Sequence, residues 1–91
     1  MIFSKSYCPY CNNAKRVFDG QGAQYNAIEL NQEADGDDIQ DALQKMTKQR
    51  TVPNIFIGGV HIGGSSDLDT VVAKGKDGKS IEQLLKEAGA L

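Results

Sequence analysis

The segment Ser6-Tyr7-Cys8-Pro9-Tyr10-Cys11 (SYCPYC, residues 6–11) contains both cysteines of this 91-residue chain. Two thiols separated by two residues can hold a metal ion, form a structural crosslink, or cycle between dithiol and disulfide. The short apolar stretch before this segment and the helical pattern after it predict a strand that leads into a helix at the first cysteine. The chemistry of the pair therefore depends on where each thiol lies on that helix.

The position of Cys8 favours redox chemistry. If Cys8 is the N-cap, Pro9 occupies the first helical position, where its missing N–H costs no hydrogen bond. The Cys8 sulfur then faces the free N–H groups of the first turn and the positive end of the helix dipole, which favour the thiolate. Lys5 adds a cation nearby. Cys11, one turn into the helix, is expected to be more buried, so Cys8 is predicted to be the nucleophile and Cys11 the resolving thiol.

The two other uses of the cysteines are weaker. A closed structural zinc site takes four ligands, whereas this chain offers two cysteines and one histidine, His61. His61 stands between apolar residues of a predicted strand, where an exposed or hydrogen-bonded strand residue is the simpler interpretation, so no metal site is predicted. A disulfide between Cys8 and Cys11 would close a very short loop and stabilise the fold by only about 2 kcal/mol.

Composition indicates one ordinary globular domain, residues 1–91, with a net charge of −2, 40% hydrophobic and 24% charged residues. Lys and Arg are spread along the chain, so nucleic acid is not an expected partner. Apolar runs are only a few residues long, so no membrane partner is expected. Two cysteines are too few for a disulfide-stapled secreted domain. We therefore expect a cytoplasmic protein, or an organellar one if a transit peptide has been removed.

Apolar periodicity and turn residues predict the order strand, helix, strand, helix, hairpin, helix, helix. The predicted elements are a strand at 1–4, a helix from Pro9 to Gly20, a strand within 24–30, a helix at 35–48, a hairpin of strands 51–57 and 60–62, and two C-terminal helices. Parallel strands joined by a helix, followed by an antiparallel hairpin, predict an α/β fold with a small four-stranded mixed sheet flanked by helices. The last two helices are predicted to open on capping boxes, Ser66 with Asp69 and Ser80 with Gln83.

Three segments resemble the glutaredoxin family in their order and spacing: KSYCPYC (5–11), QRTVPNIFIGGVHIGG (49–64) and SSDL (65–68). Glutaredoxins are glutathione-dependent oxidoreductases of the thioredoxin-fold superfamily, and CPYC is typical of their dithiol type. Thioredoxins usually carry Gly-Pro between the cysteines and a tryptophan before them, and this chain has no tryptophan. The resemblance implies a thioredoxin-like fold, here with the N-terminal helix absent and a short first strand. Ser65 stands where several relatives have a third cysteine.

The resemblance also implies a glutathione-binding site made of Lys5, Tyr10, Gln49, Val52, Pro53, Ser66 and Asp67. Pro53 would follow a cis peptide bond and face the cysteines. Val52 would pair its backbone with the cysteinyl unit of glutathione, like a short added strand. Tyr10 would flank the sulfur site.

The two ends of glutathione would bind at opposite ends of this site. Lys5 and Gln49 would bind the glycine carboxylate, and Ser66 and Asp67 would hold the γ-glutamyl end. Elementary electrostatics agrees, because a carboxylate suits a lysine or a helix N-terminus, whereas the ammonium group of glutathione suits an aspartate. Gly63-Gly64 would permit a close approach of the ligand to the backbone.

The function implied by the resemblance is reduction of protein–glutathione mixed disulfides and other disulfides through the Cys8/Cys11 pair. Glutathione would be the co-substrate, no cofactor would be permanently bound, and glutathionylated or disulfide-containing proteins would be the clients. The expected form is a monomer. The alternative is a dimeric carrier of a glutathione-assisted [2Fe–2S] cluster, which Pro9 disfavours because cluster-binding relatives mostly have Gly or Ser between the cysteines.

Overall fold

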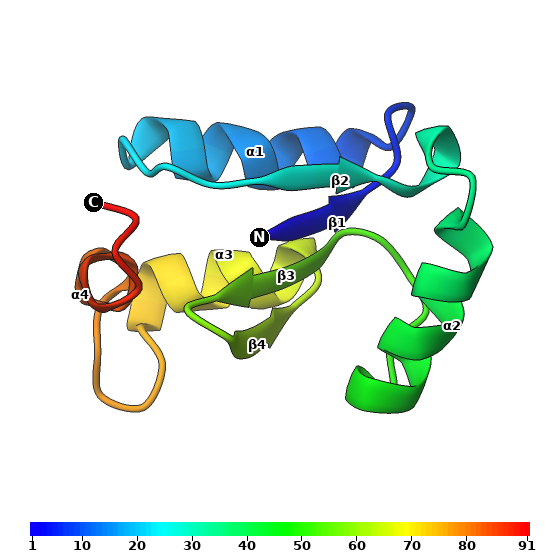
Figure 1. Cartoon of the computed structure of the whole chain (residues 1–91). Helices are drawn as coiled ribbons and strands as arrows, with labels where there is room; N and C mark the ends of the chain where they lie inside the picture. The colour runs from blue at the N-terminus through cyan, green and yellow to red at the C-terminus, as the bar shows by residue number, and fades with distance from the viewer.

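The computed structural model of residues 1–91 contains one four-stranded mixed sheet with strand order β2-β1-β3-β4 (Figure 1). The strands are β1 (Ile2–Ser4), β2 (Ala27–Glu29), β3 (Asn54–Ile57) and β4 (Val60–Gly63). β1 and β2 are parallel, and β3 is antiparallel to both β1 and β4. The expected parallel pair, antiparallel hairpin and short first strand are therefore confirmed.

Four α-helices surround this sheet: α1 (Pro9–Gly20), α2 (Gly36–Thr47), α3 (Ser65–Lys74) and α4 (Ile81–Glu87). A short 3-10 helix, η1 (Leu30–Gln32), links β2 to α2. Figure 1 shows α2 beside one end of the sheet, whereas α4 lies at the opposite end near the C-terminus. The predicted fold class, a small mixed sheet flanked by helices, is confirmed. No helix of this structure combines the length and the apolar character that crossing a membrane requires.

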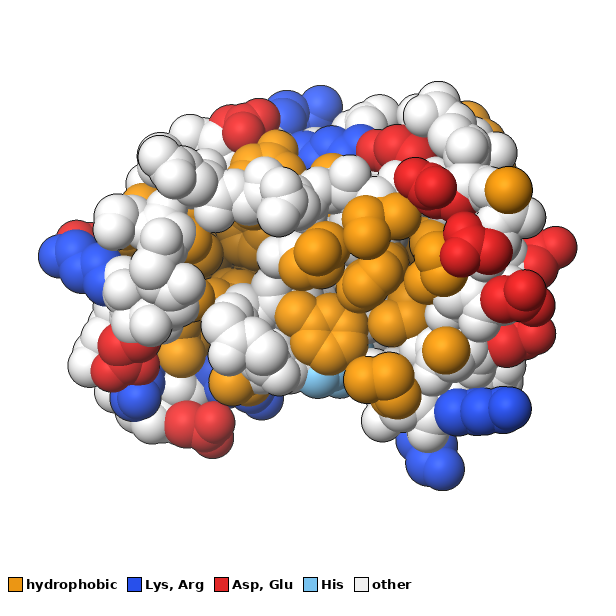
Figure 2. Space-filling view, viewed as in Figure 1, with side chains coloured by type: hydrophobic (Ala, Val, Ile, Leu, Met, Phe, Trp, Pro, Cys, Tyr) orange, Lys and Arg blue, Asp and Glu red, His pale blue; other side chains and the backbone are white.

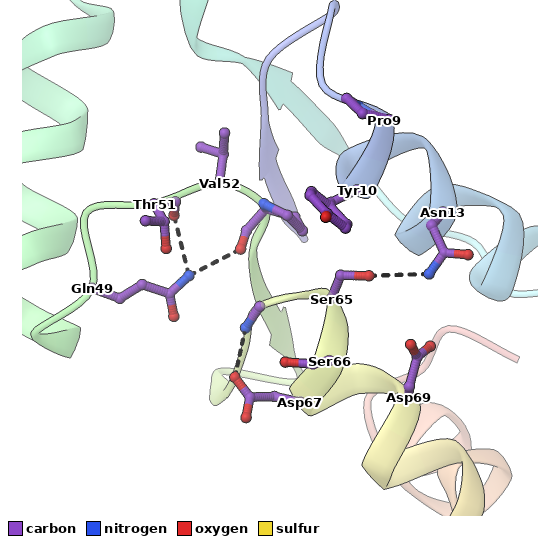
Figure 3. A pocket seen from close by; sticks show the side chains of 12 residues that line it. Pro9, Tyr10, Asn13, Gln49, Thr51, Val52, Ser65, Ser66, Asp67 and Asp69 are labelled. Carbon is purple, nitrogen blue, oxygen red and sulfur yellow. Dashed lines mark hydrogen bonds between the residues drawn. The ribbon is translucent and has the colours of Figure 1, made fainter.

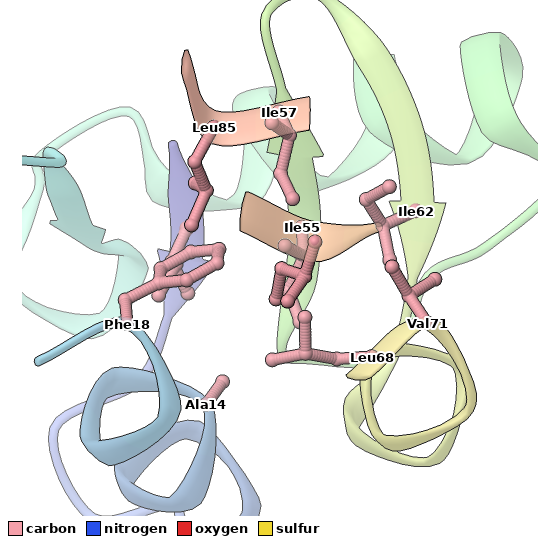
Figure 4. Close-up of a cluster of buried hydrophobic side chains, with 10 residues drawn as sticks. Ala14, Phe18, Ile55, Ile57, Ile62, Leu68, Val71 and Leu85 are labelled. Atoms are coloured by element: carbon pink, nitrogen blue, oxygen red, sulfur yellow. The ribbon is translucent and has the colours of Figure 1, made fainter. Parts of the chain in front are cut away.

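One face of the sheet and three helices form the hydrophobic core (Figure 4). Strand residues that are two positions apart, such as Ile55 and Ile57, point to the same face. They meet the apolar stripe of α1, where Ala14 and Phe18 are spaced by four residues, and the corresponding stripe of α3. Ten buried side chains contribute: Ile2, Ala14, Phe18, Ile55, Ile57, Ile62, Leu68, Val71, Ile81 and Leu85. This packing anchors α1 against the sheet.

The opposite face of the sheet carries aromatic side chains that are only partly buried. The Phe3 and Phe56 rings pack edge to face with centroids 6.0 Å apart, and the His61 ring lies 5.1 Å from Phe56. His61 Nε2 is 2.8 Å from Asn54 Oδ1, which confirms the interpretation of His61 as a hydrogen-bonded strand residue. Figure 2 shows hydrophobic side chains gathered over the strands on this face, with acidic side chains along one border.

The hairpin between β3 and β4 turns through Gly58 and Gly59. Both have positive φ angles, 57° and 80°, and Ile57 pairs with Val60 across the turn. Two central residues with positive φ are the requirement of a tight two-residue hairpin, and glycine meets it without a steric penalty. The two-residue turn predicted from the sequence is confirmed.

The predicted start of α3, with Ser66 as the N-cap, was wrong by two residues. Its N-cap is Gly64, and the carboxylate of Asp67, three residues on, accepts the Gly64 N–H at 2.9 Å. The predicted Ser66–Asp69 capping box therefore does not form. The reason is that Gly63, with φ of 120°, turns the chain out of β4 early enough for the helix to begin at Ser65.

Of two other predicted boundaries, the start of α4 agrees with the structure and the start of β3 does not. Ser80 is the N-cap of α4, as predicted, and its hydroxyl accepts the Gln83 N–H at 3.2 Å. β3 begins only at Asn54, not at Thr51. Residues 51–53 instead form a bend that approaches the start of α1, and this bend contributes to the candidate site.

Candidate active site at the start of helix α1

Cys8 is the N-cap of α1, and Pro9 is its first residue, as the sequence predicts. The Cys8 backbone is extended, with φ −88° and ψ 117°, and its N–H donates to the Lys5 carbonyl at 3.0 Å. The Cys8 sulfur accepts the Cys11 N–H at 3.3 Å. A sulfur in this position receives a backbone donor of the first helical turn, which stabilises negative charge on it.

The two thiols differ in exposure. Cys11 has no exposed surface, whereas Cys8 retains 9%. Burial raises the pKa of the Cys11 thiol, and the hydrogen bond with Cys8 raises it further. Hydrogen bonds from the Lys5 backbone and the Ser4 hydroxyl favour the Cys11 thiolate, but they do not outweigh these effects. Cys11 is thus held as a thiol, while Cys8 is the sulfur that a substrate can reach.

The bend at residues 51–53 lies against Cys8. The Cys8 thiol is 3.9 Å from the Val52 carbonyl oxygen, and the Val52–Pro53 bond is cis, as expected. The Val52 N–H makes no hydrogen bond within the protein. Next to the reactive sulfur, the bend therefore presents one backbone donor that is free to pair with an extended peptide ligand.

An open groove of about 1010 Å³ lies between the first turn of α1, the bend and the start of α3 (Figure 3). A smaller hollow of about 510 Å³ adjoins it, and Lys5, Tyr7 and Cys8 contribute to its lining. The two hollows share Pro9, Thr51 and Val52. Cys8 therefore lies beside the groove rather than at its floor.

Gln49 orders the bend. Its side-chain Nε2 donates to the carbonyl oxygens of Thr51, at 3.1 Å, and Pro53, at 2.9 Å (Figure 3). An amide nitrogen has two hydrogens to donate, so both are engaged. In this conformation Gln49 supports the bend and offers only its amide oxygen to a ligand. Its expected contact with a carboxylate would require this side chain to rearrange.

The start of α3 forms the opposite wall of the groove. The backbone N–H groups of Ser65, Ser66 and Asp67 have no partner within the protein, so they remain available to an anionic ligand. Asp67 uses one carboxylate oxygen to accept the Gly64 N–H. The Ser65 hydroxyl accepts from Asn13 Nδ2 at 3.0 Å, and this bond ties α3 to α1 (Figure 3).

Most of the residues expected to bind glutathione lie along this one groove: Tyr10, Gln49, Val52, Pro53, Ser66 and Asp67. Lys5 lies in the adjoining hollow with Arg50, whose guanidinium is paired with Asp41. The expected site residues come from three segments that are far apart in the sequence, and in the structure these segments lie side by side around the two hollows.

Four further residues line the groove and were not among the expected site residues: Asn13, Thr51, Ser65 and Asp69. Helical spacing could have identified Asn13, because it follows Pro9 by four residues and Tyr10 by three, on the same side of α1. The roles of Gly64 and Ser65 depend on where α3 begins, which the sequence misplaced. No group of three or more His, Cys, Asp or Glu side chains gathers in a way that could hold a metal ion.

A parallel strand–helix–strand unit, an antiparallel hairpin and a CxxC pair at a helix N-terminus define a thioredoxin-fold protein. The glutaredoxin family model matches residues 1–62, and the chain belongs to the glutaredoxin family. At the level of the family, it is a glutathione-dependent thiol oxidoreductase.

Plant glutaredoxins are similar to this chain over its whole length. A glutaredoxin of Ricinus communis is 52% identical, with the match covering 100% of this chain and 85% of the relative. Glutaredoxin-C2 of Arabidopsis thaliana is 50% identical, covering 100% of this chain and 78% of the relative. In the crystal structure of a buckwheat glutaredoxin–glutathione complex, the glutaredoxin chain is 54% identical in sequence to this chain. The two structures superpose with a TM-score of 0.85, over 99% of this chain and 78% of that one. Wheat glutaredoxin is 52% identical with a TM-score of 0.88, over 98% and 82%.

Proposed function

We propose that this chain reduces protein–glutathione mixed disulfides, and other disulfides, with glutathione as the reductant. The observation that carries the proposal is the position of Cys8, an N-cap sulfur beside a groove whose polar groups complement a short charged peptide. The buckwheat relative was solved as a complex with glutathione. A reducing compartment such as the cytosol, and a monomeric form, are part of this proposal.

The groove suits the three recognisable parts of glutathione. The free Val52 N–H and the neighbouring carbonyl would pair with the central cysteinyl unit, which places the glutathione sulfur near Cys8. The free N–H groups at the start of α3 would bind the α-carboxylate of the γ-glutamyl end, and Asp67 would bind its ammonium group. Lys5 would attract the glycine carboxylate from the adjoining hollow.

The proposed reaction is a pair of thiol–disulfide exchanges. The Cys8 thiolate attacks the glutathionyl sulfur of the client, the client–glutathione disulfide breaks, and the client leaves as a thiolate that takes up a proton. A second glutathione thiolate then attacks the glutathione sulfur bound to Cys8, which releases oxidised glutathione and regenerates the Cys8 thiolate. For a protein disulfide, the Cys11 sulfur attacks Cys8 in place of the second glutathione, and the resulting disulfide is reduced afterwards by glutathione.

The decisive experiment is a glutathione-coupled turnover assay on a small glutathione mixed disulfide. The wild-type chain should turn over this substrate, and Cys8→Ser should be inactive. Failure of the wild-type chain to turn over the substrate would reject the proposal. A coloured, absorbing protein obtained by anaerobic purification with glutathione, but without turnover, would favour the cluster-carrier alternative.

A further inference from the structure

The turn at residues 5–7 joins β1 to α1 and leads directly into Cys8. Two of its side chains, Lys5 and Tyr7, line the hollow beside Cys8, so the conformation of this turn decides where the Lys5 ammonium group stands. Within the turn, the Cys8 N–H donates to the Lys5 carbonyl at 3.0 Å. The residue between Lys5 and Tyr7 is held from outside the turn.

Asn31 of η1 binds that residue, Ser6, through both ends of its side-chain amide. Its Oδ1 accepts the Ser6 N–H at 3.0 Å, and its Nδ2 donates to the Ser6 hydroxyl oxygen at 2.7 Å. A carboxamide is a neutral group that can donate and accept side by side. We call this pair of hydrogen bonds the Ser6–Asn31 clamp. It restrains the backbone and the side chain of the same turn residue.

The clamp continues the register of the parallel strands β1 and β2. Their last register pair is Ser4 with Glu29, 25 positions apart in sequence, and Ser6 and Asn31 have the same separation. The backbone ladder stops there because η1 begins directly after β2. Beyond that point, the Asn31 amide supplies the donor and the acceptor that the main chain of an extended strand would offer. Figure 1 shows the chain that leaves β2 running beside the connection from β1 to α1.

We propose that Asn31 is a positioning residue for glutathione, because it holds the turn at residues 5–7 and thereby keeps Lys5 at the hollow beside Cys8. This inference rests on the proposed function, in which Lys5 attracts the glycine carboxylate. Without the clamp the turn samples other conformations, and the affinity for glutathione falls with the fraction of molecules that keep Lys5 in place. Cys8 itself stays in position, because it is the N-cap of α1 and its sulfur accepts the Cys11 N–H.

The first test is Asn31→Leu, which keeps the approximate size of the side chain and removes both hydrogen bonds. In the turnover assay on a small glutathione mixed disulfide, KM for glutathione should rise about three- to fivefold, the range expected for one net hydrogen bond. The kcat should change by less than about twofold, because the lost contact positions the ligand and does not act on the sulfur. A purely structural role would lower the free energy of unfolding and leave KM unchanged, and that result would overturn the proposal.

Two double variants trace the path from Asn31 to the ligand. Ser6→Ala removes one of the two hydrogen bonds and should raise KM less than Asn31→Leu, and it should add little to Asn31→Leu because the hydroxyl has then already lost its partner. In a Lys5→Ala background, Asn31→Leu should lose most of its effect on KM. An undiminished effect in that background would overturn the proposal, since Asn31 would then act without Lys5.

Asn26→Leu is the matched control. It makes the same substitution at an exposed asparagine just before β2 begins, at the end of the strand opposite to η1, and should leave both KM and kcat unchanged. Amide hydrogen exchange provides a readout that needs no turnover. The Ser6 N–H should exchange about fivefold faster in Asn31→Leu, and at the wild-type rate in Asn26→Leu. Unchanged exchange in Asn31→Leu would show that the clamp does not hold the turn, and the proposal would be overturned.

Failure of this inference differs from failure of the proposed function. If wild type and Asn31→Leu turn over the mixed disulfide with the same KM for glutathione, the positioning role is wrong and the proposed function stands. If wild type itself does not turn over the mixed disulfide, the proposed function fails, and the positioning role fails with it whatever the exchange of Ser6 shows.

Discussion

The Cys11 N–H donates to the Cys8 sulfur at 3.3 Å, so the resolving cysteine supports the nucleophile through its backbone. This contact depends on the main chain of residue 11 and not on its side chain. Replacement of the Cys11 thiol should therefore leave the environment of the Cys8 sulfur largely intact.

Cys8→Ser and Cys11→Ser should separate the two routes of the proposed reaction. Cys8→Ser should abolish all activity, because the other thiol, Cys11, has no exposed surface that a substrate can reach. Cys11→Ser should retain turnover of glutathione mixed disulfides and lose the dithiol reduction of protein disulfides. Parallel assays on a small mixed disulfide and on a protein disulfide measure both. Equal inactivity of the two variants toward the mixed disulfide would contradict this division of labour.

The raised pKa of Cys11 predicts a loss of stability at alkaline pH. The unfolded thiol titrates near the ordinary value of about 8.5, and the folded thiol titrates above it, so the folded state keeps its proton longer. The stability from this thiol is fully present below the unfolded pKa and is lost as pH rises through the folded pKa. Urea unfolding of reduced protein at a series of pH values measures this decline.

Cys11→Ser is the control for that pH dependence. The pKa of Tyr25 is also raised, by burial and by its hydrogen bond to Asp19, so wild type and variant should share the part of the decline that belongs to Tyr25. The extra slope of wild type above the unfolded cysteine pKa belongs to Cys11. Identical slopes in the two proteins would show that Cys11 titrates like an unfolded thiol.

Asp67→Ala should affect both stability and glutathione binding. Its carboxylate caps the Gly64 N–H, and loss of such a cap costs about 1 kcal/mol. The proposed partner of the glutathione ammonium is lost as well, so KM for glutathione should rise several-fold. Asp69→Ala is the matched control, since Asp69 also lines the groove but does not cap the helix. Equal effects of the two variants on KM would argue against a specific role of Asp67.

Gly36→Ala should destabilise the fold without acting on the site directly. A Cβ at Gly36 would lie 1.9 Å from the Leu30 carbonyl oxygen, so the backbone must move, at a cost of about 1–3 kcal/mol. Gly20→Ala is the control, because a Cβ there meets no atom within 4 Å. It should be neutral or stabilise by about 0.5 kcal/mol through the unfolded state. Urea denaturation compares the two, and a stable Gly36→Ala protein would contradict the close approach of η1 to α2.

Lys5→Ala should raise KM for glutathione in low salt, and the effect should shrink as salt increases. Lys5 lies in the hollow beside Cys8, and attraction of a carboxylate by a partly exposed ammonium is screened by ions. Lys74→Ala removes an equal charge at the far end of α3 and should leave KM unchanged. A change in KM of similar size for both variants would indicate a general effect of net charge.

Local patterns in the sequence determined much of this structure. The N-cap position of Cys8 was predictable because Pro9 and the helical period after it leave one start for α1. The hairpin turn was predictable because two consecutive glycines between β-forming runs satisfy one common turn geometry. The parallel pairing of β1 and β2 followed from the helix between them. In the first two cases, residues within a few positions of one another carry the interaction, and in the third a single helix connects the two strands.

Only the tertiary structure decided which distant groups meet Cys8 and Cys11. The Val52 carbonyl is 44 positions from Cys8 in sequence, and Glu29 is 25 from Ser4. Such contacts depend on the register of β1 with its neighbours and on how α1 packs over the sheet, and a shift of one residue would turn Ser4 to the other face of the sheet. The cap of α3 was missed for a related reason. Ser65, Ser66 and Asp67 follow one another, and each could cap a helix, so several helix starts have similar free energy. The turn at Gly63 selects one of them.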